Sequence, residues 1–163
     1  MDRREAIGVL GLYTQTYAQA SARARLLGAW RLRSSVLTFK DGHVERPYGD
    51  KPLGRIEYGK GRRMSVLLMR PGRGISLPPG MPLNKASCED LHDVLTGFVA
   101  YFGTFDVEET TQTVIHHAEA SLLPESVGAD LKRRFRFDES RLILTRPAPP
   151  YGSGELTWER ESD

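Results

Sequence analysis

The sequence predicts an all-β protein, an up-and-down antiparallel barrel of about eight or nine strands with a helix before it and a short helix within one long loop. Three observations lead to this prediction. Segments of alternating apolar and polar residues recur after about residue 27, short turns separate most of them, and strand follows strand in serial order. A barrel of about eight strands is wide enough to hold one small ligand.

The expected strands begin at Gly28. They span residues 28–39, 43–46, 53–58, 62–69, 101–107, 113–122, 131–138, 141–145 and 155–160. In the first strand, alternation places Trp30 and Leu32 on one face together with Ser34 and Val36. The residues expected in the core include Trp30, Leu32, Phe135, Leu142 and Leu144.

The first 26 residues differ from the barrel domain expected over residues 27–160. Alanines favour a helix here. Arg3-Arg4, the apolar stretch 6–12 and the small residues at 18–20 also resemble a twin-arginine export signal. Polar residues at 14–17 interrupt the apolar stretch, so we favour the helix, and with it a cytoplasmic location, narrowly over a vestigial signal.

The one long loop, residues 70–86, is rich in proline and glycine. A helix is expected after it over residues 87–95, because Ser87 followed by Asp90 is typical of a capped N-terminus. Long insertions between strands often act as lids. We therefore expect the loop and the helix to cover one mouth of the barrel.

The amino-acid composition limits the classes of binding partner that the sequence predicts. The 163 residues carry 23 basic and 21 acidic side chains, a net charge of +2, which offers no electrostatic reason to expect nucleic acid. No apolar run approaches the ~20 residues needed to cross a bilayer, so no membrane partner is expected. Cys88 is the single cysteine, and no phosphate loop, nucleotide fingerprint or cysteine-based zinc motif occurs, so neither metal nor cofactor is expected. A homodimer is left open.

The strands at 101–107 and 113–122 hold the densest group of chemically capable side chains. His116 and His117 are adjacent, so they point to opposite faces of a strand and cannot jointly hold a metal ion. The face containing His116 is smaller and more apolar, so we expect His116 to face the lumen. It would be a hydrogen-bonded core residue, a ligand contact or a general acid and base.

Arg133 alternates with apolar neighbours on the strand 131–138. A guanidinium on such a face needs an anionic partner, either Glu119 or a bound carboxylate, unless a bulge turns it outward. We expect Tyr101, His116 and Arg133, from three consecutive strands, to converge on the lumen. The candidate ligand-binding residues beside them are Tyr58, His117, Glu119 and Trp30.

Several separate motifs carry a family resemblance. They are Gly28-Ala29-Trp30-Arg31-Leu32, the run from Tyr101 to Val107, His116-His117, and the terminal Leu156-Thr157-Trp158-Glu159-Arg160. In this order they resemble the lipocalin-like domain family of small bacterial and fungal proteins, over about residues 27–160. The resemblance implies a lipocalin-like β-barrel and supplies no catalytic residues. Some members are similar to proteins acting in secondary-metabolite pathways.

Two functions from different classes follow. The first is binding of a small, largely apolar molecule with a carbonyl or carboxylate end. The alternative is a cofactor-free isomerase, cyclase or dehydratase of secondary metabolism, in which His116 moves a proton and Tyr101 or Arg133 stabilises an oxyanion. A third and weaker hypothesis is a structural barrel filled by its own side chains.

Overall fold

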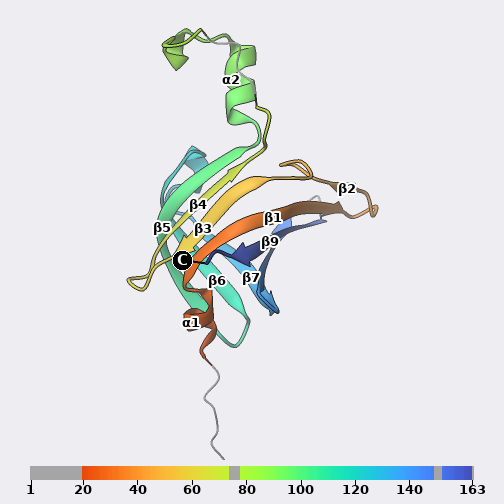
Figure 1. Cartoon of the computed structure of the whole chain (residues 1–163), viewed down its shortest axis with the longest axis vertical. Coiled ribbons are helices and arrows are strands. Elements are labelled where there is room, and N and C mark those ends of the chain that lie inside the picture. The colour runs from red at the N-terminus through yellow and green to blue at the C-terminus, as the bar shows by residue number, and fades with distance from the viewer. Residues whose placement is uncertain (1–19, 74–77, 149–151, 163) are drawn as a thin grey trace, which may run out of the picture.

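A single antiparallel sheet of nine strands closes on itself in the computed structural model, which describes residues 20–73, 78–148 and 152–162 (Figure 1). The strands are β1 (Gly28–Phe39), β2 (Val44–Glu45), β3 (Leu53–Tyr58), β4 (Arg63–Met69), β5 (Phe98–Glu108), β6 (Thr113–Ser121), β7 (Asp130–Asp138), β8 (Arg141–Ala148) and β9 (Gly152–Arg160). The helices are α1 (Ala22–Leu26), α2 (Cys88–Leu95) and the short 3₁₀ turns η1 (Leu83–Lys85) and η2 (Pro124–Ser126). The fold class expected from the sequence is confirmed.

The barrel closes where β1 meets β9. Their pairing runs from Trp30 opposite Arg160 to Phe39 opposite Gly152. The short β2 pairs only with the far end of β1, so it is an addition to an eight-strand barrel. Gly152 has a φ of +126°, and a Cβ at this position would lie 2.0 Å from the carbonyl oxygen of Thr38. A glycine is therefore required for the close approach of the two strands.

A bulge in β1 corrects the expected strand phase. The register with β9 shifts between Leu32 and Ser34. Trp30 and Leu32 are buried as expected, but beyond the shift Ser35 is the buried residue, while Ser34 is only partly covered. An extra residue on one strand of a pair reverses the facing of every side chain after it.

Part of the core packs against α1, whose Leu26 is fully buried. Trp30, Leu32, Phe135, Leu142 and Leu144, all expected in the core, are buried. Trp30 donates its indole N–H to the carbonyl of Leu26 at 2.8 Å, and the Arg160 guanidinium lies 4.1 Å from the centre of its ring. Helix α1 has only five residues, so tertiary contacts, and not helix propensity, hold it in place. It closes one end of the barrel (Figure 1).

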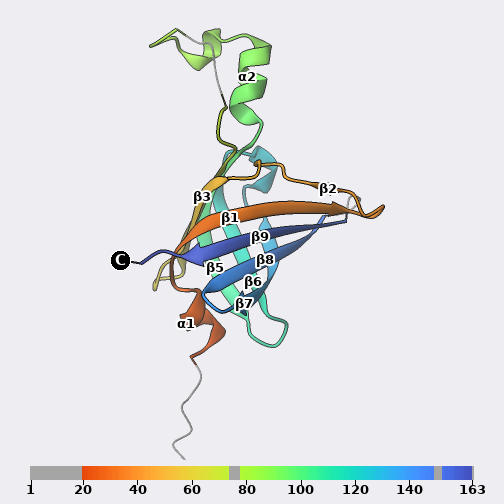
Figure 2. The same ribbon diagram turned by 45° about the vertical axis from the view of Figure 1, so that its right-hand side comes forward.

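The described residues of the long loop and of its helix do not form the lid expected over one mouth of the barrel. Ser87 and Asp90 form the reciprocal capping box at the start of α2. However, α2 and η1 stand away from the barrel, beyond the ends of β4 and β5 (Figure 1, Figure 2). We call residues 78–96 the arm. Its attachment includes Arg73, which donates to the carbonyl of Val94 and lies over the ring of Phe98.

Other expectations fall partly outside the described residues. Residues 1–19, where a helix or an export signal was expected, are not described, and neither are residues 74–77 of the long loop.

The hairpin of β8 and β9 extends to Ala148 and Gly152, further than the expected 141–145 and 155–160. Among the described helices, none has both the length and the apolar character needed to cross a membrane.

Candidate functional site

A cavity of about 490 Å³ lies inside the barrel and is lined by residues of β1 and of every strand from β3 to β9. This volume is within the usual range for small-molecule sites. Its wall is mostly apolar and includes Ile56, Val66, Leu68, Val99, Leu144 and Leu156. Residues of two connections, among them Tyr48 and Ser126, contribute to its lining. The barrel is therefore not filled completely by its own side chains.

His116 lies at the centre of a chain of three hydrogen-bonded side chains. Its Nε2 is 2.8 Å from the hydroxyl of Tyr58, and its Nδ1 is 2.9 Å from the hydroxyl of Tyr101. Tyr58 is on β3 and His116 on β6, two strands that are not neighbours in the sheet, so this contact crosses the interior. His116 and Tyr101 line the cavity, whereas Tyr58 lies behind the histidine and does not.

Burial keeps all three groups uncharged. His116 is 1% exposed, and desolvation, assisted by the nearby charges of Arg133 and His117, lowers its pKa to about 3. Burial raises the pKa of Tyr58 well above its ordinary value and also raises that of Tyr101, and the charge of Arg133 opposes the effect at both tyrosines. Near neutral pH the cavity therefore faces a neutral imidazole and neutral phenols.

Arg133 brings a positive charge to this wall. It lines the cavity, donates one hydrogen bond to the carbonyl of Lys132 at 2.8 Å, and lies close enough to Tyr101 for its charge to lower that residue's pKa against the larger raising effect of burial. Within the described part of the chain, no carboxylate forms an ion pair with Arg133. Glu119, one of the two partners expected from the sequence, is exposed on the outer face of β6.

A second positively charged side chain at the cavity, Arg146, was not predicted from the sequence. Arg146 lines the cavity near Tyr48, whose pKa it lowers against the larger raising effect of burial. The sequence does contain a pattern that indicates this position, because Arg146 follows Leu142 and Leu144 at the two-residue spacing of one strand face. The expected strand ended at residue 145. Glu155 also lines the cavity, but Arg136 pairs with it at 3.5 Å.

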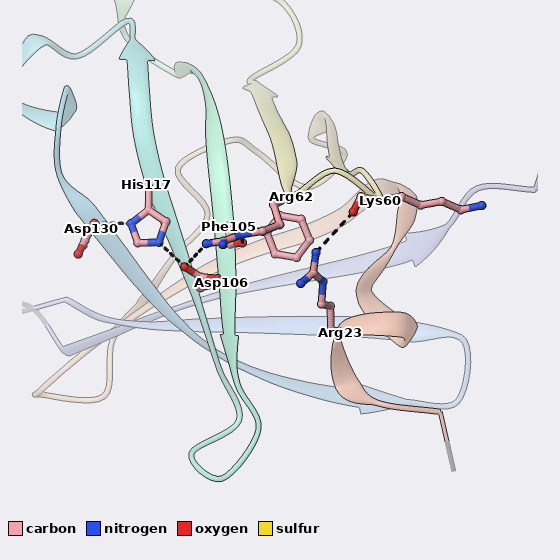
Figure 3. Close-up of polar contacts among 7 residues, drawn as sticks. All are labelled: Arg23, Lys60, Arg62, Phe105, Asp106, His117 and Asp130. Atoms are coloured by element: carbon pink, nitrogen blue, oxygen red, sulfur yellow. Dashed lines mark hydrogen bonds and ion pairs between the residues drawn. The ribbon is translucent and has the colours of Figure 1, made fainter. Parts of the chain in front are cut away.

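His117 points out of the barrel, where it belongs to a polar cluster on three strands (Figure 3). Its Nδ1 donates to Asp130 at 2.6 Å, and its Nε2 lies 3.1 Å from Asp106, which Arg62 also contacts. The hydrogen bond to Asp130 is the main reason why the pKa of His117 is raised. This histidine stabilises the outer wall and does not contact the cavity.

The candidate residues therefore separate into three groups. Tyr101, His116 and Arg133 come together at the cavity, and Tyr58 supports them from behind. Trp30 lies in the core beside α1 and not at the cavity, and His117 and Glu119 face outward. No group of three or more histidine, cysteine, aspartate or glutamate side chains is placed to hold a metal ion among the residues that the structure describes.

A family model described as the lipocalin-like domain matches residues 27–161. The chain belongs to the lipocalin-like domain family. A lipocalin-like protein from Bacteroides uniformis ATCC 8492 is a similar solved structure, with 15% sequence identity, a TM-score of 0.43, and coverage of 84% of this chain and 99% of that one. A redesigned β-barrel has 11% identity, a TM-score of 0.42, and coverage of 88% and 100% respectively. No curated protein matches the sequence.

Proposed function

We propose that this lipocalin-like barrel binds one small, largely apolar molecule whose polar end is a carbonyl or a carboxylate. One observation carries the proposal: Arg133 lines a mainly apolar cavity, and the described chain supplies no carboxylate to pair with it. A partly desolvated guanidinium without an anion is unfavourable, and a bound carboxylate would remove that cost. Arg146 adds a second positive charge to the same cavity.

The apolar part of the ligand would lie against the aliphatic wall. Burial of apolar surface is favourable by about 25 cal/mol per Å², so the wall supplies affinity, while the few polar groups set orientation. Tyr101 is the neutral partner of Arg133 in this arrangement, and a phenol and a guanidinium together match the two oxygens of a carboxylate.

The experiment is a titration with decanoate and with decanol, which share a chain length and differ in the polar end. Trp158 lines the cavity, so its fluorescence reports occupancy. We expect decanoate to bind more tightly, and Arg133→Met to reduce decanoate affinity by about tenfold to a hundredfold with little change for decanol, the usual scale for a hydrogen bond to a charged group.

Arg134→Met is the matched control, because Arg134 is exposed on the same strand. Equal losses in the two variants would show that net charge, not the cavity, is responsible. Failure of decanoate and decanol alike to bind would contradict the proposal.

The enzymatic alternative keeps one observation in its favour, the Tyr101 hydroxyl beside Arg133 in the cavity. Both nitrogens of His116 are already hydrogen-bonded, so a proton would pass to substrate through Tyr101 and not directly from the imidazole. Arg133 would stabilise the oxyanion of an isomerisation, cyclisation or dehydration. Tyr101→Phe should then lower turnover of a substrate by about 10²–10⁴-fold, whereas a binding protein has no turnover to lose.

A further inference from the structure

The hydrogen-bonded chain of side chains Tyr58–His116–Tyr101 is enclosed by protein at Tyr58 and reaches the cavity at Tyr101. Tyr58 is 2% exposed, does not line the cavity, and His116 is the hydrogen-bond partner of its hydroxyl. Tyr101 lines the cavity and also lies within reach of Arg133. The two hydroxyls, although chemically identical, therefore face different surroundings.

This difference sets the direction of both hydrogen bonds. A neutral imidazole has one N–H and one bare nitrogen, so one tyrosine must donate to it and the other must accept from it. If Tyr58 accepted, its own proton would be buried without a partner, which is costly. Tyr58 therefore donates to Nε2, the His116 proton resides on Nδ1, and Nδ1–H donates to the oxygen of Tyr101.

The Tyr101 oxygen then accepts from His116, and Arg133 can donate to it as well. Its own O–H is left to point into the cavity. Trp158 also lines the cavity, and its indole N–H is buried without a hydrogen-bond partner in the described part of the chain. The carboxylate of Glu155 is already paired with Arg136.

We infer that Tyr58 and His116 are positioning residues that make Tyr101 an obligate hydrogen-bond donor, so that the cavity selects a ligand whose polar end only accepts, such as a ketone or an ionised carboxylate, over the matching alcohol. This inference rests on the proposed function and adds the rule by which the site discriminates. Beside Tyr101 and Arg133 an alcohol would leave its own proton facing two donors, whereas a ketone oxygen would receive the Tyr101 proton directly.

The first test needs no ligand. Nitrogen–proton NMR correlations of the histidine rings distinguish the two neutral tautomers, and His116→Gln identifies the His116 signals by their loss. We expect a protonated Nδ1 and a bare Nε2 in the free protein near neutral pH. A protonated Nε2 would overturn the inference.

The second test compares α-tetralone with α-tetralol, which differ only in the ketone and the hydroxyl. The unmodified protein should bind the ketone about fivefold to a hundredfold more tightly. Tyr58→Phe leaves the cavity wall intact but frees Nε2, so His116 can change tautomer and Tyr101 can turn its proton toward the ring. The preference for the ketone should then shrink toward that of Tyr101→Phe.

An undiminished preference in a folded Tyr58→Phe variant would overturn the role of the chain. Failure of both probes and of decanoate to bind, with the Nδ1–H tautomer observed, would overturn the proposed function and the selectivity while establishing the direction of the hydrogen bonds. The two failures are thus distinguishable.

Discussion

The imidazoles of His116 and His117 lie on opposite sides of β6. His116 is 1% exposed and lies between two tyrosine hydroxyls, whereas His117 lies on the outer wall between Asp106 and Asp130. The pKa of His116 is lowered to about 3, and that of His117 is raised. The two adjacent histidines therefore contribute with opposite sign to the pH dependence of stability.

The stability of the protein should fall on acidification because of His116. Its pKa is about 6.5 in the unfolded chain and about 3 in the folded one, so between these values the unfolded state binds more protons. The free energy of unfolding is highest above the upper value and decreases by up to ~1.4 kcal/mol per pH unit as the pH falls through this window. Urea unfolding at several pH values measures the slope, and His116→Gln should flatten it.

His117→Gln is the control for that slope. A raised pKa means that the His117 ion pairs stabilise fully below about pH 6.5 and lose their effect as the pH rises through the folded value. The pairs are at the surface, so the effect is at most ~1 kcal/mol. This variant should leave the acid slope in place, and a slope unchanged in His116→Gln would show that carboxylates alone cause it.

Trp30 should be critical for the closed end of the barrel. Trp30→Ala removes a fully packed ring and should lower the free energy of unfolding by ~3–5 kcal/mol. Trp30→Phe keeps a ring but leaves the Leu26 carbonyl without its indole donor, so a smaller loss of ~1–3 kcal/mol is expected. Denaturant titrations rank the two, and a loss below ~1 kcal/mol for Trp30→Ala would contradict this account of the core.

Gly103 should tolerate no side chain. It adjoins the register shift between β5 and β6, and a Cβ there would lie 1.9 Å from the carbonyl oxygen of His117. Gly103→Ala must displace backbone, so a loss of at least ~1–3 kcal/mol in unfolding free energy is expected. Gly61→Ala, which meets nothing within 4 Å, is the matched control and should be neutral or slightly stabilising.

The arm should be dispensable for binding in the cavity. No described residue of the arm lines the cavity, and the backbone N–H of Arg70 already bonds to the carbonyl of Gly97 at 2.7 Å below it. Replacing residues 71–96 by an Asn-Gly turn should join β4 directly to β5. Decanoate affinity should change by less than about twofold. A larger loss would mean that the arm reaches the cavity when ligand is present.

Much of the fold could be read from the sequence because side-chain alternation is a local property. It located β1 and β3 to the residue, and it distinguished the inward His116 from the outward His117. The cap at Ser87 located the start of α2 for the same reason, since a capping box involves only residues within one helical turn.

The features that could not be predicted from the sequence depend on contacts between distant parts of the chain. The bulge after Leu32 is a mismatch between β1 and β9, and no pattern within β1 reveals it. The contact of Tyr58 with His116 crosses the lumen between strands that do not pair, so it follows from barrel curvature and not from spacing. The position of the arm is likewise not local information: it leaves Met81, Leu83 and Leu95 exposed, although apolar residues of this kind usually pack onto a neighbouring element.

The seam between β1 and β9 also sets the order of events during synthesis. Trp30 pairs with Arg160, so the first barrel strand to leave the ribosome waits for the last one. Contacts so distant in sequence slow folding, because much of the chain must be ordered before they form. Until β9 is made, β1 and β8 each present an unpaired edge open to other chains. The nascent protein is therefore most vulnerable to aggregation just before its final strand emerges, and crowding of translating ribosomes would aggravate that exposure.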